Sequence, residues 1–255
     1  MALALPHHWS HVISPLPLTG KIGAIPDGVR IYAISDIHGH VDLLDNVFVR
    51  LDRHLAKYPI KRPIHVFLGD YIDRGPTSRS VIDRLIERSS NHESVFLKGN
   101  HEELLIEFLK NPLVLDQWRH FGALETLVSY GLKPAAQITP KLRDQLAMEL
   151  AAVLPASHNA FFSQLQSSYE CGEYFFAHAG VRPGVALDQQ NERDLLWIRE
   201  EFLEHKEKFD KIIVHGHSPV SKLEILPNRI NIDTGAYATG LLTCLMIEDG
   251  RLKSI

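Results

Sequence analysis

The chain has 255 residues, which is enough for one large single-core domain or for two small domains. Hydrophobic residues make up 45% of it and charged residues 23%, as is ordinary for a soluble globular enzyme. The net charge of −4 offers no general reason to expect binding to nucleic acid or to a membrane. These numbers leave the oligomeric state open.

The N-terminal segment and the two cysteines indicate in which cellular compartment the protein is expected. Prolines interrupt the first 18 residues, and no basic region precedes an apolar one, which argues against a secretory signal and against a membrane span. We therefore expect a cytoplasmic protein whose residues 1–28 form an N-terminal arm. Cys171 and Cys244 are far apart in apolar contexts, so we expect buried free thiols rather than a disulfide.

Three strand–turn–helix units are expected after this arm. Apolar runs and helical periodicity predict strands at 29–34, 64–68 and 94–97 and helices at 41–57, at 77–88 and from about residue 100. This order is typical of an α/β fold with a largely parallel sheet. Ligand sites in such sheets lie beyond the carboxyl ends of the strands, where all three polar motifs fall. We therefore expect the motifs to share one site.

The pattern changes in the second half of the chain. Helical periodicity broken by prolines predicts a helical insertion at about 111–168, which could be a lid, a substrate-recognition surface or a structural cap. Later elements are expected as strands at 173–177 and 211–214, a charged helical stretch at about 189–208, and a hairpin-like pair at 229–232 and 241–247. No linker separates these parts, so one domain over 29–255 is favoured.

Side chains that can bind a metal recur at the strand ends. They are Asp36, His38, Asp70, Asn100, His178 and His217. Carboxylate, imidazole and amide ligands together suit Mn, Fe or Zn better than Ca²⁺. The spacing indicates two ions, because Asp36 and His38 can hold one while the two oxygens of Asp70 can bridge it to a second. Water between two such cations is a hydroxide near neutral pH.

The neighbouring polar residues indicate phosphate chemistry. Arg74 and Arg199 carry guanidinium groups that match phosphate oxygens, with Arg193 as the alternative to Arg199. His101 directly follows Asn100, and Asp73 could accept its second N–H, so that protonated His101 donates to the leaving-group oxygen. The expected reaction is direct attack of the bridging hydroxide on a phosphoester.

Five motifs in this order resemble the calcineurin-like metallophosphoesterases, and within them the small bacterial and bacteriophage members of the phosphoprotein phosphatase group. They are Asp36-x-His38-Gly39, Gly69-Asp70-x-x-Asp73-Arg74-Gly75, Gly99-Asn100-His101-Glu102, His178-Ala179-Gly180 and Gly216-His217-Ser218-Pro219. The resemblance implies an α/β fold with a central β-sandwich flanked by helices. It also implies two divalent ions, with manganese the leading choice and iron or zinc as alternatives.

The resemblance assigns a role to each site residue. It implies a first ion on Asp36, His38 and Asp70, and a second ion on Asp70, Asn100, His178 and His217. Phosphate would be bound by Arg74, Arg199, Asn100 and His101, and His101 with Asp73 would donate the proton. From the residues alone, His215 would alternate away from His217 on an extended backbone, so we expect it either to support a ligand from outside or to be structural.

The sequence leaves three candidate functions. The leading one is a phosphomonoesterase acting on phosphoserine or phosphothreonine in proteins. The second is a hydrolase of dinucleoside polyphosphates such as diadenosine tetraphosphate, in which the resemblance implies that the first carboxylate of the Asp73-Arg74-Gly75 triplet is replaced. The third is a phosphate-binding scaffold without turnover.

Overall fold

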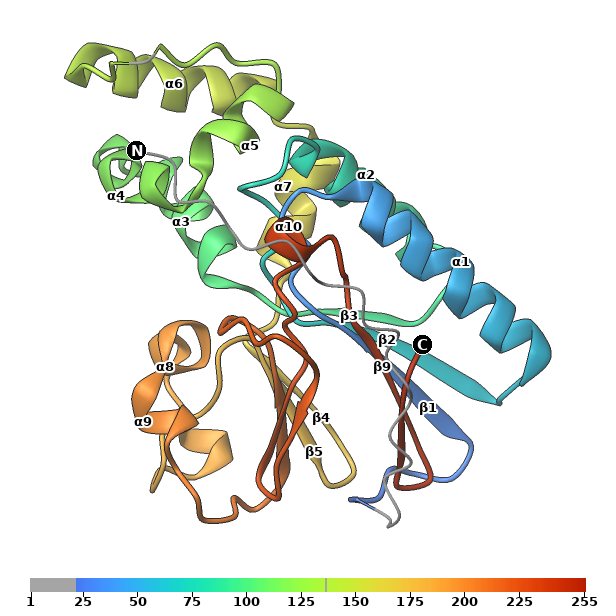
Figure 1. The fold of residues 1–255 in the computed structure, drawn as a ribbon. Helices are drawn as coiled ribbons and strands as arrows, with labels where there is room; N and C mark the ends of the chain where they lie inside the picture. Colours follow the sequence, from blue (N-terminus) through green and yellow to red (C-terminus); the bar gives the residue numbers. More distant parts are fainter. Residues whose placement is uncertain (1–21, 136) are drawn as a thin grey trace.

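Two five-stranded sheets face each other, and helices cover the outer face of each (Figure 1). The computed structural model describes residues 22–135 and 137–255, so most of the predicted N-terminal arm lies outside the described residues. This α–β–β–α layering confirms the mixed α/β class and the sandwich that the resemblance implies. The domain boundaries themselves stay a prediction.

The first sheet contains the three strands expected from the N-terminal half. β1 (Val29–Ile34), β2 (Arg62–Phe67) and β3 (Ser94–Phe96) run parallel, and β9 (Cys244–Glu248) and β10 (Arg251–Ser254) extend the β1 edge antiparallel. The helices α1 (Val41–Lys57) and α2 (Ser78–Ser89) pack on its outer face. Their bounds lie within two residues of those predicted.

The second sheet has the order β4-β5-β6-β8-β7. Its strands are β4 (Ser168–Cys171), β5 (Tyr174–Ala177), β6 (Ile212–His215), β7 (Glu224–Ile225) and β8 (Arg229–Asn231). β5, β6 and β8 are parallel, whereas β4 and β7 join antiparallel at the two edges. A 3₁₀ turn (Leu187–Gln189) and the short helices α8 (Glu192–Trp197) and α9 (Glu200–Leu203) lie beside its outer face.

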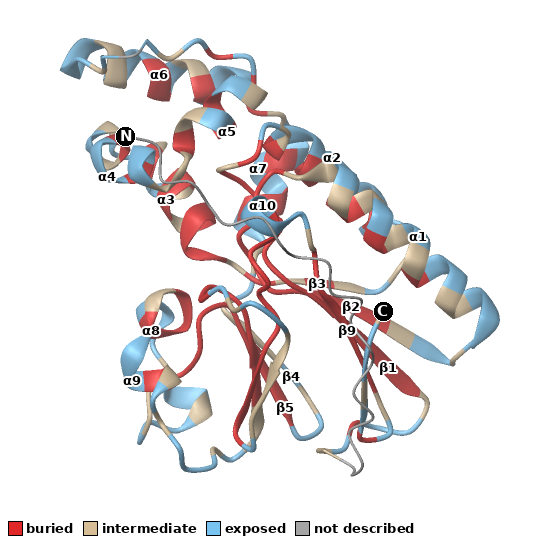
Figure 2. Ribbon diagram, in the orientation of Figure 1, coloured by how far each residue is buried: buried red, intermediate tan, exposed pale blue. Residues whose placement is uncertain are grey.

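Alternation along the central strands builds the core. In β1, Ile31 and Ala33 belong to the apolar layer between the sheets, and Tyr32 and Ile34 face the helices. Both faces are therefore buried, which explains why β1 is mostly apolar (Figure 2). Cys244 in β9 is a buried free thiol, as predicted. Cys171 is also a free thiol, but the prediction that it is buried is wrong, because it lies in the edge strand β4 and is partly exposed.

The helical insertion lies beyond the carboxyl ends of the parallel strands. It follows α3 (Asn100–Phe108) and consists of 3₁₀ turns at Pro112–Val114 and Arg119–Phe121 and the helices α4 (Leu115–Trp118), α5 (Ala123–Ser129), α6 (Pro140–Val153) and α7 (Ala156–Ser163). The Thr139 side chain accepts a hydrogen bond from Leu142 N and so caps α6, and Pro140 occupies the first position of that helix. Among its described residues the stretch has no strand before β4.

Two predictions about the C-terminal half are wrong. The runs at 229–232 and 241–247 do not pair with each other, since β8 lies in the second sheet and β9 in the first. The run at 189–208 is not one helix, because the backbone is extended at Ile198 (ψ 142°) and again leaves the helical region at Arg199 (φ −133°). The edge strands β4, β7 and β10 were not expected either.

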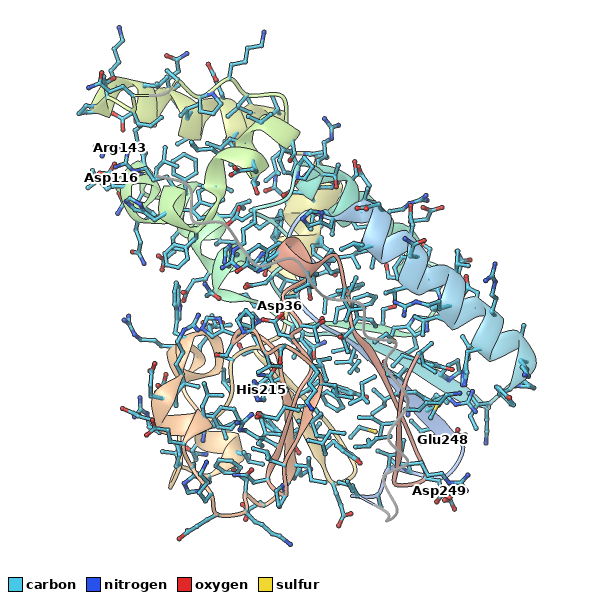
Figure 3. All side chains as sticks on the ribbon, viewed as in Figure 1. Asp36, Asp116, Arg143, His215, Glu248 and Asp249 are labelled. Atoms are coloured by element: carbon cyan, nitrogen blue, oxygen red, sulfur yellow. The ribbon has the colours of Figure 1, made fainter. Side chains whose placement is uncertain are left out.

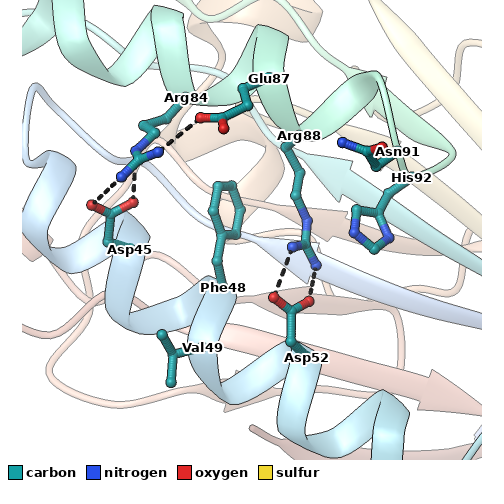
Figure 4. Close-up of a pocket in the computed structure, with 9 residues that line it drawn as sticks. All are labelled: Asp45, Phe48, Val49, Asp52, Arg84, Glu87, Arg88, Asn91 and His92. Carbon is teal, nitrogen blue, oxygen red and sulfur yellow. Dashed lines mark hydrogen bonds and ion pairs between the residues drawn. The ribbon is translucent and has the colours of Figure 1, made fainter.

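An open groove of about 440 Å³ separates α1 from α2 on the outer surface (Figure 4). Ion pairs cross it, with Arg84 on Asp45 and Arg88 on Asp52, and the Arg88 guanidinium lies 4.7 Å from the Phe48 ring centroid. These contacts join the two helices, and the groove contains none of the predicted site residues. No helix in the described part of the chain is long and apolar enough to cross a membrane.

Candidate active site

Except for Arg199, which lies between α8 and α9, the predicted site residues lie in the turns that follow the parallel strands of both sheets. Asp36 and His38 follow β1, Asp70 to Arg74 follow β2, and Asn100 and His101 begin α3. His178 follows β5 and His217 follows β6 in the second sheet. Figure 3 places Asp36 where the two sheets meet, below α10 (Ala236–Thr239).

Backbone strain is concentrated in these turns. Six non-glycine residues have a positive φ in the part of the chain that the structure describes, and five of them are predicted site residues: His38, Asp70, Asp73, Arg74 and His217, with φ from 48° to 71°. Such left-handed conformations cost free energy that the surrounding structure must supply. Strain of this kind is typical of functional sites.

Asp70 is the centre of two groups of possible metal ligands. His38 Nε2 and His101 Nε2 each lie 3.6 Å from Asp70 Oδ2, and His178 Nε2 lies 3.4 Å from Asp70 Oδ1. His217 completes the second group, and its Nδ1 is 3.1 Å from His178 Nε2. The two oxygens of Asp70 thus face different groups, as expected for a bridging carboxylate.

Histidine tautomers show that this cluster fits cations. The carbonyl oxygens of Ile72 and Leu68 can only accept, so His38 Nδ1 (3.0 Å) and His178 Nδ1 (2.9 Å) must donate to them. Each histidine then carries a lone pair on Nε2, and that of His178 lies 3.0 Å from Asn100 Oδ1. Lone pairs that converge in this way repel one another unless a cation lies between them.

The pKa values agree with neutral ligand histidines. Burial and the neighbouring His101 hold the pKa of His38 well below its usual range. Burial together with His178 lowers the pKa of His217 to about 2. For Asp70, burial would favour the neutral acid, but the neighbouring histidines, with His101 first among them, outweigh burial and lower its pKa. The site therefore presents neutral imidazoles and an ionised carboxylate.

Asp36 lies in neither ligand group. Its Oδ2 accepts a hydrogen bond from the backbone N–H of His217 (3.0 Å), and its buried Oδ1 has no hydrogen-bond partner among the described residues. A Cβ on Gly216 would lie 2.1 Å from that Oδ1, so only glycine fits between them. Burial and the carboxylates of Asp233 and Asp70 raise the pKa of Asp36. Its role as a ligand of the first ion stays a prediction.

His101 differs from the other histidines in the partner of its Nδ1. That atom lies 2.6 Å from Asp73 Oδ2, which also accepts from Trp118 Nε1 (2.6 Å). The hydroxyl of Thr126 donates to the other oxygen of Asp73 (2.5 Å). Burial opposes the protonation of His101, but Asp70 and the hydrogen bond to Asp73 outweigh it and raise the pKa of His101. Its carboxylate partner suits a proton donor.

Arg74 lies at the surface of the site. Its guanidinium carbon is 4.2 Å from the centroid of the Tyr237 ring, and its backbone N–H donates to Gly122 O (3.2 Å). Within residues 22–135 and 137–255, no ion pair or side-chain hydrogen bond engages this guanidinium. Its N–H donors are therefore free to bind an oxyanion.

Arg199 is placed closer to the site than its alternative, Arg193. Arg199 makes long contacts of 3.5 Å to Ser218 Oγ and to His217 O, and it contributes to lowering the pKa values of His178 and His217. Arg193 acts electrostatically on Asp194 instead. The geometry therefore favours Arg199 as the second phosphate-binding arginine.

Glu102 has a function that the sequence analysis missed. Its buried carboxylate accepts from the backbone N–H groups of Gly99 (3.0 Å), Asp70 (2.9 Å), Tyr71 (2.8 Å) and Ile72 (3.3 Å). It thereby holds the turn that carries Asp70 against the start of α3. The signal in the sequence is a glutamate three residues after the N-cap Gly99, the spacing of a capping box.

His215 is a structural residue, one of the two roles expected for it. It is buried, its Nδ1 lies 3.1 Å from Gly216 O, and its Nε2 lies 3.3 Å from Arg229 Nη1. Its ring packs edge-on against Phe202 (4.9 Å between centroids). Figure 3 shows it within the second sheet.

Comparison with known proteins identifies the class. The chain matches the family model of the calcineurin-like phosphoesterases over residues 29–240. It therefore belongs to this family of metallophosphoesterases, in agreement with its motifs and its fold.

Its relatives give a more particular comparison. The asymmetrical bis(5′-nucleosyl)-tetraphosphatase PrpE of Anoxybacillus flavithermus is 30% identical over 87% of this chain and 92% of its own length. The protein of the same name from Geobacillus thermodenitrificans is 26% identical over 89% of this chain and 94% of its own length.

Two solved structures share the fold. One, described provisionally as a diadenosine tetraphosphatase, superposes with a TM-score of 0.58 at 20% identity and covers 94% of this chain and 95% of its own. The other, a protein serine/threonine phosphatase from Saccharomyces cerevisiae, has a TM-score of 0.52 at 16% identity and covers 89% of this chain and 79% of its own. At these sequence identities the two structures indicate a shared fold and nothing more.

Proposed function

We propose that this chain is a metal-dependent hydrolase that cleaves bis(5′-nucleosyl) tetraphosphates asymmetrically, into a nucleoside triphosphate and a nucleoside monophosphate. The observation that carries the proposal is the similarity to the PrpE tetraphosphatases, which extends over nearly the whole of both chains. The second function from the sequence analysis thus replaces the protein phosphatase as the leading one.

Two divalent ions, with manganese the leading choice, would be held around Asp70. His38 with Asp36 would hold one, and Asn100, His178 and His217 would hold the other, which are nitrogen and oxygen ligands suited to Mn, Fe or Zn. When bound, such ions polarise phosphate oxygens and lower the pKa of a bound water. The converging lone pairs and the unpartnered Asp36 Oδ1 support this assignment.

The protein's own groups would then bind the phosphate chain and supply the proton. Arg74 and Arg199 present guanidinium donors to the phosphate oxygens and stabilise the charge that develops on them. His101, held by Asp73, donates a proton to the oxygen of the departing phosphate. Trp118 and Thr126 keep the Asp73 carboxylate in the orientation that His101 requires.

A phosphomonoester substrate remains the second candidate. The observation in its favour is the intact Asp73–His101 pair, at 2.6 Å, because an alkoxide leaving group needs a proton more than a phosphate does. Phosphoserine or phosphothreonine in proteins would be the substrate class. The third candidate, a scaffold without turnover, is disfavoured because every predicted side chain is present.

The test compares the two substrates and one variant. With Mn²⁺, the wild-type protein should cleave diadenosine tetraphosphate to ATP and AMP with a higher kcat/KM than it shows on a phosphoserine peptide. The His101→Asn variant should lose about 10²–10⁴-fold in kcat on the peptide and clearly less on the dinucleotide, whose leaving group is more acidic.

Other outcomes would decide against the proposal. A higher kcat/KM on the peptide, or two ADP as the products, would reject the asymmetrical tetraphosphatase. Binding of either compound by the Mn²⁺-loaded protein without any turnover would support the scaffold instead.

A further inference from the structure

Tyr237 is an exposed aromatic residue at the edge of the candidate active site. Its side chain is 41% exposed, and it belongs to the short helix α10, directly after the Asp233-Thr234-Gly235 turn. Its ring lies edge-on to the His38 ring, with 5.4 Å between centroids, and 4.2 Å from the guanidinium carbon of Arg74. An aromatic surface open to solvent thus adjoins both a predicted metal ligand and the predicted phosphate-binding arginine.

The backbone around Tyr237 is anchored. Gly235 and Gly240 adopt left-handed conformations at the two ends of α10, and Gly235 N–H donates to Asp233 Oδ1 (2.8 Å). The Thr239 hydroxyl donates to Thr234 O (2.9 Å). The ring is therefore presented from a fixed turn, while none of the hydrogen bonds found within the described residues involves its hydroxyl.

We propose that Tyr237 is a stacking surface for one nucleobase of the substrate. This inference takes its nucleotide substrate from the proposed function. When Arg74 binds a terminal phosphate of the tetraphosphate chain, the attached nucleoside lies next to Arg74, and the Tyr237 ring is the aromatic surface in contact with that arginine. Stacking a base on it would bury apolar area that is otherwise open to water.

An alternative role for Tyr237, in which its ring only positions Arg74, predicts a different result. If the ring only holds Arg74 through a cation–π contact, its loss would weaken every phosphate ligand by the same factor. If the ring stacks on a base, its loss would weaken nucleotides and have a smaller effect on inorganic phosphate. The ratio of two inhibition constants separates these roles.

The experiment measures the Ki of AMP and the Ki of inorganic phosphate against hydrolysis of p-nitrophenyl phosphate by the Mn²⁺-loaded enzyme. In the wild-type protein, AMP should bind more tightly than phosphate. In Tyr237→Ala, the ratio of the phosphate Ki to the AMP Ki should fall by about tenfold, within the range expected for the loss of one base–aromatic stack. Tyr237→Phe should keep the wild-type ratio, because the hydroxyl is not required.

Tyr58→Ala is the matched control, since Tyr58 is 45% exposed at the end of α1 and contacts Lys57 and His54 rather than the site. This variant should keep the wild-type ratio. An unchanged ratio in Tyr237→Ala, or a wild-type protein that binds AMP no better than phosphate, would overturn the inference. Failure of the wild type to cleave diadenosine tetraphosphate would count against the proposed function, whereas the inhibition ratios test base stacking separately.

Discussion

At the scale of single residues, the partner of Nδ1 separates the roles of His38 and His178 from that of His101. A carbonyl oxygen can only accept, so Nδ1 of His38 and of His178 carries the proton, and their lowered pKa values leave a lone pair on Nε2 toward Asp70. The Asp73 carboxylate stabilises a positive charge on His101 instead. Histidines at similar distances from one carboxylate can therefore act as metal ligands or as a proton donor.

Glu102 provides the prediction at this scale. Glu102→Gln should lower the affinity for Mn²⁺ by about 10–100-fold, because an amide cannot accept from four N–H groups and the turn of Asp70 would shift. The lost acceptors should also cost about 1–3 kcal/mol of stability. Titration calorimetry with Mn²⁺ and urea unfolding measure the two effects. Glu107→Gln, on the exposed face of the same helix, is the control, and equal Mn²⁺ affinity in the two variants would contradict the role of Glu102.

At the scale of elements, the helical insertion contributes to the site and does more than cap the sheets. Trp118 from α4 and Thr126 from α5 donate to Asp73, and the Phe121 ring lies edge-on to His101 at 5.8 Å. Gly122 O accepts from Arg74 N. The insertion thus positions both the predicted proton-donor pair and an arginine.

Two glycines of the insertion give the prediction at this scale. A Cβ on Gly122 (φ 98°) would lie 2.5 Å from Arg74 N, whereas one on Gly131 (φ 92°) would meet nothing within 4 Å. Replacement by alanine should cost about 1–3 kcal/mol of backbone strain at both positions. Only Gly122→Ala should also displace Arg74 and raise the Ki of inorganic phosphate. Thermal unfolding and inhibition measure these quantities, and equal Ki values for the two variants would contradict the clash.

At the scale of the whole molecule, the site lies where the two sheets meet. His38 and Asp70 come from the turns of the first sheet, and His178 and His217 from those of the second. Leu97, just after β3, and Gln166, just before β4, form an isolated β-bridge. Ions bound around Asp70 would therefore connect the two halves of the sandwich.

Removal of the metal tests this connection. Chelation should lower the Tm of the wild-type protein, because a ligand at 100 times its Kd adds about 2.7 kcal/mol per site to the folded state. Calorimetric scans with EDTA and with added Mn²⁺ measure the shift. Asp70→Asn should abolish most of the dependence of the Tm on Mn²⁺, whereas Asp45→Asn, on α1, should retain that dependence. A wild-type Tm that does not depend on Mn²⁺ would rule out such stabilisation.

The sequence by itself determined the features that depend on neighbouring residues. The apolar runs of β1, β2 and β5 and the periodicity of α1 lie where they were predicted, because burial of one face repeats at the period of the local backbone. Polar residues at the ends of β1 and β2 had to meet, because these parallel strands end at the same edge of one sheet. The class of protein follows from the resemblance of the motifs that these residues form.

Only the tertiary structure decided which distant segments meet. A run such as 241–247 encodes a buried strand but not its partner, and in the structure β9 pairs antiparallel with β1. The same holds for Trp118, Thr126, Glu102 and Tyr237, which reach the site from other elements. Their contacts depend on how the helices and the two sheets pack, and no short-range pattern records that arrangement.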